Sequence, residues 1–181
     1  MGKKNIKYQI IFYSYWHAGG KDGANMEVDN AVLKDKNKLP YIGGKTIKGL
    51  IKDAAIFINK YQPDLVSDDF IKNVFSEKDR AYKQDENVAN NFSSATLEEK
   101  IKEEYTHLLY HKKNSTSIGE NKQAINQSLN TTEVAIPLTL IGSIDNFNDD
   151  TEMLKLSLKA LKKLGEKRFK GLGRCKVEII E

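Results

Sequence analysis

The stretch Leu39-Pro-Tyr-Ile-Gly-Gly-Lys-Thr-Ile-Lys-Gly-Leu50 changes from an extended segment into a helix within a few residues. Pro40 favours extended backbone around it, two glycines follow, and lysines occupy the first turns of the predicted helix. Glycine lets backbone approach a ligand closely, and the first N–H groups of a helix are unpaired and carry a positive dipole. The stretch therefore predicts a binding site for an anion such as an RNA phosphate.

The triplet Gly44-Lys45-Thr46 has the ending of a nucleotide-binding P-loop, but the rest of that motif is missing. A P-loop needs an earlier glycine in the pattern Gly-x-x-x-x-Gly-Lys-Ser/Thr. Here that position is Leu39, and Pro40 follows it. Hydrolysis of ATP or GTP at this stretch is therefore disfavoured.

Composition is that of a mildly basic protein with one domain. The 181 residues include 29 Lys and Arg against 25 Asp and Glu, a net charge of +4 that allows a nucleic-acid partner without requiring one. The single cysteine, Cys175, excludes an internal disulfide, and its alternating surroundings predict a buried, unreactive thiol. Because no secretion signal and no long apolar run is present, we expect a cytoplasmic protein with no membrane partner.

Periodicity predicts an α+β fold. Alternating apolar residues predict strands over 4–14, 133–144 and 175–180. A repeat of about 3.6 residues predicts helices over 45–61 and 149–164. With the middle hairpin partly hidden, these elements follow the order β-α-β-β-α-β of a ferredoxin-like (RRM-like) core, and we expect residues 1–181 to form a single domain.

Two segments interrupt this core. Residues 62–110 predict a helical insertion, in which one helix begins at Ser67 and another at a capping box formed by Thr96 and Glu99. Residues 111–132 are rich in Lys, Asn, Ser, Thr and Gln and offer almost nothing to bury. They predict a protruding loop or hairpin.

A second segment rich in glycine and cations follows the last predicted helix. Residues 165–174 carry three glycines and four cations around one aromatic residue, Phe169. Such loops suit an RNA backbone, and the ring could stack on a base. Each of the two segments also has an interpretation without RNA. The lysines of the first predicted helix could form a solvated helix face, and residues 165–174 could be an ordinary turn between a helix and a strand. The predicted RNA-binding residues are Gly43, Gly44, Lys45, Thr46, Lys48, Lys52, Lys167, Arg168, Phe169, Lys170, Gly171 and Arg174.

Several motifs occur in the order in which they occur in a known family. They are His17-Ala-Gly-Gly20, Asp29-Asn-Ala-Val-Leu-Lys-Asp35, Leu39 to Gly49, Thr116-Ser-Ile-Gly119, Ser128-Leu-Asn-Thr-Thr-Glu-Val134 and Gly171-Leu-Gly-Arg174. In this order they resemble the RAMP superfamily of CRISPR RNA-guided complexes. Within it the chain looks most like the repeating backbone subunits of type III effectors, which polymerise along a guide RNA and whose protruding thumbs interrupt the guide–target duplex.

The resemblance implies partners and a catalytic residue. The partners are a guide (CRISPR) RNA, a single-stranded target RNA, further copies of the chain and other effector subunits. Asp29 matches the aspartate that supports metal-dependent target cleavage in those subunits, and a carboxylate can hold Mg²⁺ or another divalent metal near a phosphate. The chain departs from the family pattern at Ala31 and Gly43, where proline is usual, and at Lys52, where arginine is usual.

Other side chains could support or replace Asp29. Asp22 and Asp35 are loop carboxylates that could instead close turns, and His17 could transfer a proton or order a turn. The expected function is binding of guide RNA with metal-dependent cleavage of the paired target RNA. Two alternatives stay open: a scaffold that binds guide RNA without chemistry, and a metal-independent endoribonuclease that processes the CRISPR repeat transcript, with His17 or a lysine–tyrosine set as acid and base.

Overall fold

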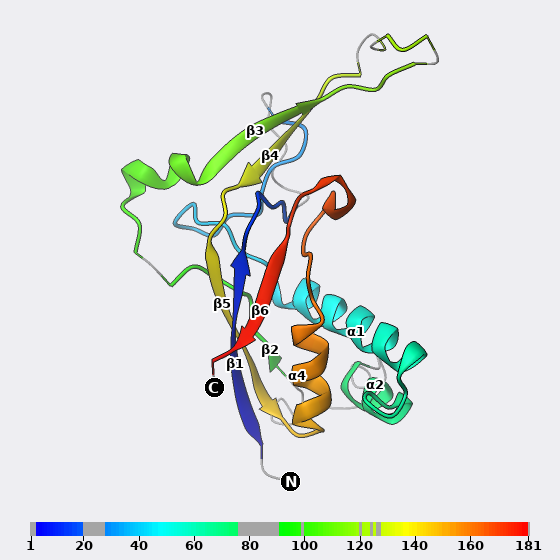
Figure 1. Ribbon diagram of the computed structural model, residues 1–181. Helices are drawn as coiled ribbons and strands as arrows, with labels where there is room; N and C mark the ends of the chain where they lie inside the picture. The colour runs from blue at the N-terminus through cyan, green and yellow to red at the C-terminus, as the bar shows by residue number, and fades with distance from the viewer. Residues whose placement is uncertain are drawn as a thin grey trace, which may run out of the picture.

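The described chain forms a mixed α/β fold around one antiparallel sheet (Figure 1). The computed structural model describes residues 3–19, 28–75, 91–98, 100–119, 121–123, 125 and 128–180. The strands of the main sheet lie in the order β2-β5-β1-β6. Their bounds are Asn91–Phe92 for β2, Thr139–Phe147 for β5, Lys4–Phe12 for β1 and Cys175–Ile179 for β6.

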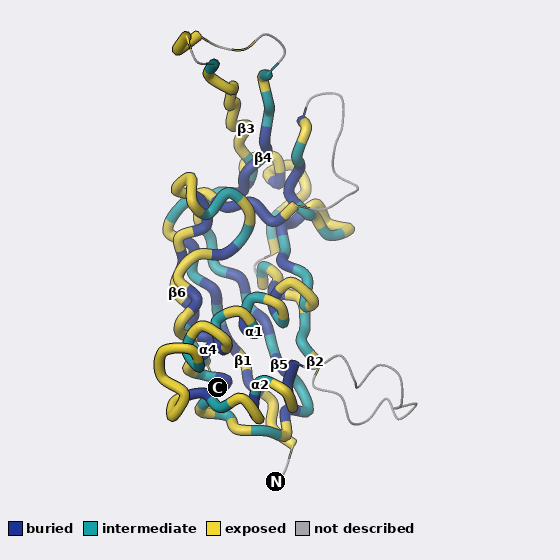
Figure 2. The backbone as a smooth tube through the Cα atoms, turned by 90° about the vertical axis from the view of Figure 1, so that its right-hand side faces the viewer, coloured by how far each residue is buried: buried dark blue, intermediate teal, exposed yellow. Residues whose placement is uncertain are grey.

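Helices cover one face of this sheet. α1 (Gly44–Tyr61) packs against α4 (Thr151–Lys159), and α2 (Asp68–Phe75) lies beside α1. Figure 2 views the molecule from the side of these helices and shows the central strands as buried behind them. None of the helices, over the described residues, combines the length and the apolar character needed to span a lipid bilayer.

The core confirms the periodic patterns of the first strand and first helix. Buried residues are Ile6, Tyr8, Ile10 and Phe12 in β1, and Ile47, Ile51 and Ala55 in α1. Gly142 of β5 lies against the ring of Tyr8, whose hydroxyl would be 2.5 Å from a Cβ at that position. Alternation in the strand and a one-turn repeat in the helix thus direct their apolar faces toward each other.

A separate antiparallel hairpin projects from the end of the main sheet (Figures 1 and 2). It consists of β3 (Tyr110–Ser115) and β4 (Asn130–Ala135), and the 3₁₀ helix η1 (Glu103–Leu109) leads into it. We call β3, β4 and the described residues between them the thumb hairpin. Beyond its first residue β3 is exposed on both faces, as the polar composition of this segment predicts.

The prediction of one strand over 133–144 is wrong, because the segment is divided between two sheets. β4 ends at Ala135 and β5 begins at Thr139. Pro137 lies between them and has no N–H to contribute to a ladder. The Leu138 carbonyl then accepts a hydrogen bond from the Phe12 N–H at 3.0 Å, which brings the chain into the main sheet.

The prediction of a helix that begins at Thr96 is also wrong. Thr96 exchanges two backbone hydrogen bonds with Ile141 of β5, at 2.9 and 2.7 Å, and so lies at the edge of the sheet. Pairing with β5 gives both the N–H and the carbonyl of Thr96 a hydrogen-bond partner. If Thr96 were the N-cap of a helix, the first N–H groups of that helix would have no partner within it. Glu99, the expected capping partner, lies outside the described residues. The segment 62–110 therefore supplies α2 and η1, and also β2 of the main sheet.

The helix predicted over 149–164 is shorter than its apolar repeat suggests. The Asp150 carboxylate caps α4 by accepting hydrogen bonds from the N–H groups of Glu152 and Met153. The helix ends at Lys159 because the following residues pair with the chain that leads into β6. There the Leu164 N–H donates to the Gly173 carbonyl at 2.9 Å.

Candidate nucleic-acid interface

The two segments rich in glycine and cations line one cavity of about 560 Å³. Gly43 and Thr46 enter it from the start of α1. Residues 165–169 enter it from the loop before β6, where Arg168 begins the 3₁₀ helix η2 (Arg168–Lys170). The remaining lining residues are Ala18, Gly19, Leu33, Ile42 and Leu50. Segments from opposite halves of the chain thus form a single site.

Close backbone contacts hold the second segment against the turn after β1. The Glu166 N–H donates to the His17 carbonyl and the Gly173 N–H donates to the Tyr15 carbonyl, each at 2.8 Å. Gly165 has a φ of 92°, and a Cβ on it would collide with the His17 carbonyl oxygen. Glycine is required at this position both by the left-handed backbone and by the close approach.

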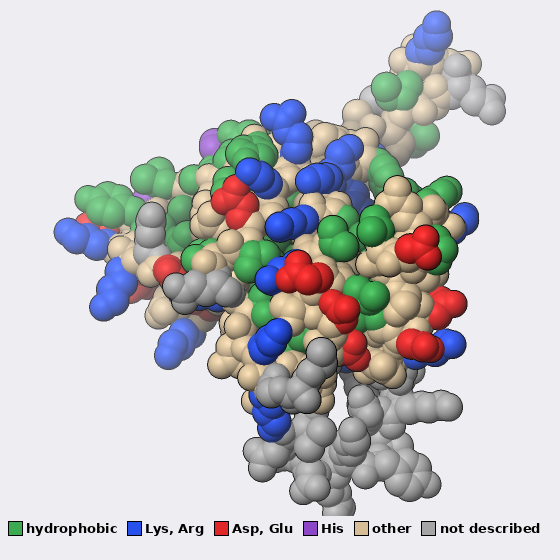
Figure 3. Space-filling model, turned by 60° about the horizontal axis from the view of Figure 1, so that its bottom comes forward, with side chains coloured by type: hydrophobic (Ala, Val, Ile, Leu, Met, Phe, Trp, Pro, Cys, Tyr) green, Lys and Arg blue, Asp and Glu red, His purple; other side chains and the backbone are tan. Residues whose placement is uncertain are grey.

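Arg168 and Phe169 present a cation and a ring at the cavity. The Phe169 side chain is 91% exposed, and the Arg168 guanidinium lies 5.8 Å from its ring centroid. An exposed ring next to a cation suits stacking on the bases of single-stranded RNA. Lys170 lines a neighbouring cavity of about 140 Å³ together with Lys113 of the thumb hairpin. The basic surface therefore continues from the first cavity to the thumb hairpin, whereas acidic and basic side chains are interspersed on the face seen in Figure 3.

The four lysines of α1, Lys45, Lys48, Lys52 and Lys60, are not among the described lining residues of this cavity. Lys45 is exposed in the first turn, and Lys52 is partly buried farther along the helix. The ammonium group of Lys48 lies 5.6 Å from the centroid of the Phe92 ring. Gly44 faces the Phe92 carbonyl, which leaves no room for a Cβ there. Of the residues predicted at the start of α1, the cavity therefore includes Gly43 and Thr46.

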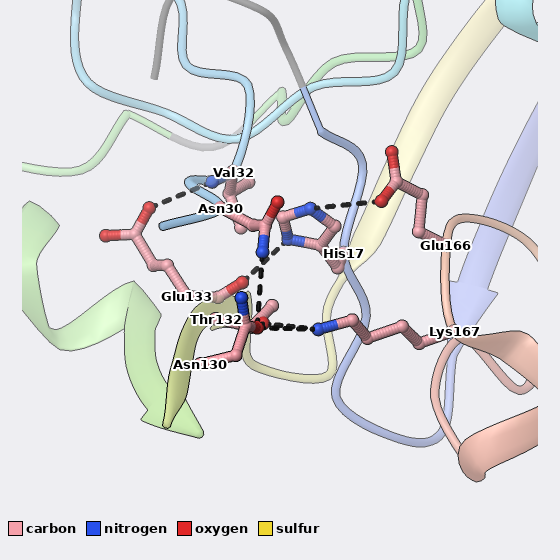
Figure 4. A network of polar contacts seen from close by, with 8 residues as sticks. All are labelled: His17, Asn30, Val32, Asn130, Thr132, Glu133, Glu166 and Lys167. Atoms are coloured by element: carbon pink, nitrogen blue, oxygen red, sulfur yellow. Dashed lines mark hydrogen bonds and ion pairs between the residues drawn. The ribbon is translucent and has the colours of Figure 1, made fainter. Parts of the chain in front are cut away.

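Lys167 joins the glycine-rich loop to the thumb hairpin rather than extending into solvent (Figure 4). Its ammonium group donates to the Thr132 hydroxyl and, at 3.4 Å, to Oδ1 of Asn130. The same Asn130 oxygen accepts hydrogen bonds from Nδ2 of Asn30 at 3.3 Å and from the Thr132 hydroxyl at 3.1 Å. The charge of Lys167 is thus engaged inside the protein.

Of the other predicted residues, Gly171 has a φ of 83° at the end of η2, and Arg174 is exposed just before β6.

Asp29 lies against Thr131, the second residue of β4 in the thumb hairpin, beside the network around Lys167. Its N–H donates to the Thr131 carbonyl at 3.0 Å, and its Oδ2 accepts from the Thr131 N–H at 2.7 Å. Glu133 fastens the same segment farther along, because its carboxylate accepts from the Val32 N–H at 3.0 Å and from the Lys34 ammonium at 2.8 Å. Asp29 is exposed, and the bond to Thr131 fixes the direction of its side chain.

The rivals of Asp29 have different surroundings. His17 is only 1% exposed, and its Nδ1 donates to the Glu133 carbonyl at 2.7 Å, which fixes the proton on that nitrogen. Asp35 closes a turn, because its Oδ1 accepts from the N–H groups of Asn37 and Leu39, both at 2.8 Å. Asp22 lies outside the described residues. Over the described ranges, no group of three or more His, Cys, Asp and Glu side chains is placed to hold a metal ion.

Sequence reasoning missed two acidic residues of this region. Glu166 lies inside the second glycine-rich segment, and its position directly after Gly165 was an available signal. Glu133 lies in a predicted strand, where the alternation marks it as facing away from Val134. Its role in fastening residues 28–35 depends on a contact across the chain that no local pattern indicates.

Fold and cavity together define a mixed α/β protein with a projecting hairpin and a glycine-rich, cationic cavity. The chain belongs to the RAMP superfamily, whose sequence model matches residues 12–176, and this confirms the resemblance seen in the motifs. A chain in the cryo-EM structure of the Type III-B Cmr-beta bound to cognate target RNA is similar, with a TM-score of 0.71 and 12% identity over 98% of both chains. A chain of Type III-B Cmr-beta in the apo state is similar with a TM-score of 0.67 and 9% identity, over 98% of this chain and 97% of that one. No curated protein sequence matches the chain.

Proposed function

We propose that the chain is a guide-RNA-binding subunit of a type III CRISPR RNA-guided effector complex. The observation that carries the proposal is that Gly43 and Thr46 line the same cavity as residues 167–169. Membership of the RAMP superfamily and the fold similarity to chains of Cmr-beta support it. In this proposal the complex acts in the cytoplasm, and the partners are guide RNA, single-stranded target RNA, further copies of the chain and other effector subunits.

The same proposal includes a ferredoxin-like core. In the sheet order β2-β5-β1-β6, β1 and β6, the first and last strands along the chain, are neighbours. Along the chain, α1 follows β1 and α4 follows β5. This arrangement supports the β-α-β-β-α-β interpretation, with β2 as its short second strand. The thumb hairpin then lies between the second and third core strands.

The guide backbone would be held by charge and by unpaired backbone donors. α1 begins at Gly44 without a side-chain cap, so its first N–H groups can reach a phosphate. Lys45 is exposed in that first turn, and Arg168 contributes a guanidinium from the other segment. Such contacts read the backbone rather than the sequence, and their strength falls with salt.

We assign Asp29 a supporting role in cleavage of target RNA paired to the guide. An exposed carboxylate is a hard oxygen donor and fits a divalent ion such as Mg²⁺, whose other ligands would be water and RNA phosphate oxygens. A bound ion supplies charge stabilisation at the scissile phosphate. The chain itself fixes the carboxylate through Thr131 of the thumb hairpin.

Asp29→Asn tests the catalytic assignment, because asparagine keeps an oxygen acceptor for the Thr131 N–H and removes the charge. In the assembled complex, target cleavage should fall by about 100-fold or more while guide RNA affinity stays within about twofold. Asp35→Asn is the matched control, since Asp35 closes a turn, and it should cleave at close to the wild-type rate. Full cleavage by Asp29→Asn would contradict the assignment and leave the binding proposal standing.

A scaffold without chemistry is the second candidate, and the bond between Asp29 and Thr131 favours it by giving Asp29 a structural role. Guide binding without cleavage in the wild-type complex would select this candidate. Two observations count against a repeat-processing endoribonuclease that uses His17 or Tyr110: His17 is buried, and burial together with the nearby Glu133 and Asp35 carboxylates raises the pKa of Tyr110. The Tyr110 hydroxyl also donates to the Lys38 carbonyl at 2.6 Å, so it is a poor proton acceptor.

A further inference from the structure

We propose that the cavity of about 560 Å³ receives an unstacked RNA base and that Glu166 recognises the edge of that base, favouring bases with an exocyclic amino group. The inference rests on the proposed binding of RNA at this cavity. It goes beyond that proposal because it assigns a base-binding site, and a preference among bases, to residues that binding of RNA phosphates does not require. A cavity of this size lies within the range of about 300–1,000 Å³ that is usual for small-ligand pockets.

Part of the cavity lining, which we call the apolar floor, is formed by Ala18, Leu33, Ile42 and Leu50. Ile42 is almost fully buried. A phosphate gains nothing from such a surface, since it would lose solvation there. The flat face of a base is suited to it, because a splayed-out base in single-stranded RNA buries its face against protein side chains.

Glycines keep the cavity open on its sides. A Cβ on Gly43 would meet nothing within 4 Å, so the space above this residue is free of other protein atoms. A Cβ on Gly19 would lie 2.8 Å from Oε1 of Glu166 and 2.9 Å from Nε2 of His17. The lack of a side chain at Gly19 therefore makes room for the Glu166 carboxylate at the cavity wall.

Glu166 is an acid in an otherwise cationic site, and its side chain is 61% exposed. Its carboxylate repels phosphate but accepts hydrogen bonds from amino groups, as glutamate does from the N4 amino group of cytosine. Its Oε2 lies 3.8 Å from Nε2 of His17, which is too long for a hydrogen bond, so acceptor positions remain available. Figure 4 shows the Glu166 side chain directed toward His17 and the Lys167 side chain directed toward Thr132.

Arg168 and Phe169 supply the remaining surface for a base. Both line the cavity, and the ring is almost entirely exposed, with the guanidinium near its face. Stacking of this kind is indifferent to which base is bound. Discrimination must therefore come from the edge, where Glu166 is the carboxylate among the described lining residues.

Comparing cytosine with uracil distinguishes recognition of the base edge from stacking on the base ring. The two bases have the same size, but cytosine carries an amino donor at position 4 where uracil carries a carbonyl acceptor. We would measure binding of the full-length chain to oligocytidylate and oligouridylate of equal length by fluorescence anisotropy. The wild type should bind oligocytidylate about tenfold more tightly, the factor that corresponds to about 1.4 kcal/mol. Glu166→Gln should reduce the ratio to about two or less, because the amide can donate to uracil as well as accept from cytosine.

Glu104→Gln is the matched control, since Glu104 is an exposed acid of η1 outside the cavity, and it should keep the wild-type ratio. Equal binding of the two RNAs by the wild type, or an unchanged ratio in Glu166→Gln, would overturn the base site while salt-dependent RNA binding left the proposed function intact. Absence of RNA binding by the wild type would overturn both. If Glu166→Gln fails to fold, abasic oligoribonucleotide decides: wild-type affinity equal to that for oligocytidylate rejects the base site, and weaker affinity supports it.

A mononucleotide separates an RNA base from a free nucleotide as the occupant. Cytidine monophosphate should displace labelled oligocytidylate only at concentrations far above the affinity of the oligomer, because the phosphate contacts outside the cavity are lost. Displacement at equal concentration would identify a mononucleotide site and reject the base site in RNA.

Discussion

Gly173 shows at the residue scale how closely the glycine-rich loop is packed. Its φ is 71°, and a Cβ on it would collide with the Leu164 carbonyl oxygen, whereas Gly171 has a φ of 83° and nothing within 4 Å of its Cβ position. Gly171→Ala should therefore lower the free energy of unfolding by about 1–2 kcal/mol, the usual cost of left-handed backbone. Gly173→Ala should cost about 2 kcal/mol more, because the collision adds to that strain.

Urea unfolding of both variants checks this prediction. Equal losses in the two variants would show that the contact between Leu164 and Gly173 does not constrain the loop. A greater loss in Gly171→Ala would contradict the packing described for the loop altogether.

The buried thiol of Cys175 makes the free energy of unfolding depend on pH in the alkaline range. Burial raises the pKa of its thiol to about 12 from an ordinary value of 9.0, while nearby Lys162 opposes the shift. The unfolded chain therefore loses the thiol proton first, so stability falls as pH rises above about 9. Between about pH 8 and pH 10 the thiol should account for a loss of about 1 kcal/mol.

The measurement compares the wild type with Cys175→Ala by chemical unfolding at each pH. The variant is expected to be less stable overall because a small cavity replaces the sulfur. Its stability should nevertheless fall less steeply over this pH range. Parallel curves for the two proteins would rule out the thiol as the cause.

Single residues differ in how far the sequence predicts them. The burial of Cys175 follows from alternation in its own strand, and the structure confirms it. The engagement of Lys167 with Thr132 and Asn130 could not be predicted, because it depends on how a loop near the end of the chain meets the thumb hairpin. Local sequence gives the charge of Lys167 but not its partner.

At the scale of elements, Glu133 of β4 fixes the segment that carries Asp29. Its carboxylate binds the Val32 N–H and the Lys34 ammonium from one side, and Asp29 binds Thr131 from the other end of the segment. Glu133→Gln should weaken the ion pair with Lys34 but keep an acceptor for Val32, whereas Glu133→Ala removes both contacts.

Hydrogen exchange followed by mass spectrometry reports this directly. In Glu133→Ala, exchange in residues 29–34 should be faster by about tenfold or more, and Glu133→Gln should lie between that variant and the wild type. Peptides from β1 and α1 should be unchanged. Exchange that stays at the wild-type rate in residues 29–34 would show that other contacts hold the segment.

Elements were predictable where their pattern is long and their packing is one-sided. β1 and α1 alternate or repeat over many residues, and both lie where the sequence places them. β2 contains only Asn91 and Phe92, which is too short for any periodicity. The polar start at Thr96 suggested a helix, but pairing with Ile141 along the sheet edge prevailed over that local preference.

At the scale of the whole molecule, the cavity exists because segments from opposite halves of the chain meet at one end of the main sheet. The turn after β1, the start of α1 and the loop before β6 meet there, and the thumb hairpin rises beside them (Figure 1). The sequence indicated each glycine-rich segment separately, and the order of motifs linked them to one superfamily. The apolar floor and Glu166 could not be predicted, since they become neighbours only in the folded chain.

The most direct test of the central claim, that both glycine-rich segments hold one RNA, is the salt dependence of binding to single-stranded guide RNA. Each phosphate contact contributes about 0.7 to the slope of log K against log salt concentration. The double variant Lys45→Gln, Arg168→Gln should therefore have a slope about 1.4 shallower than the wild type, with each single variant accounting for about half, while Lys72→Gln on α2 should match the wild type. Wild-type slopes in both single variants and in the double variant would contradict the claim.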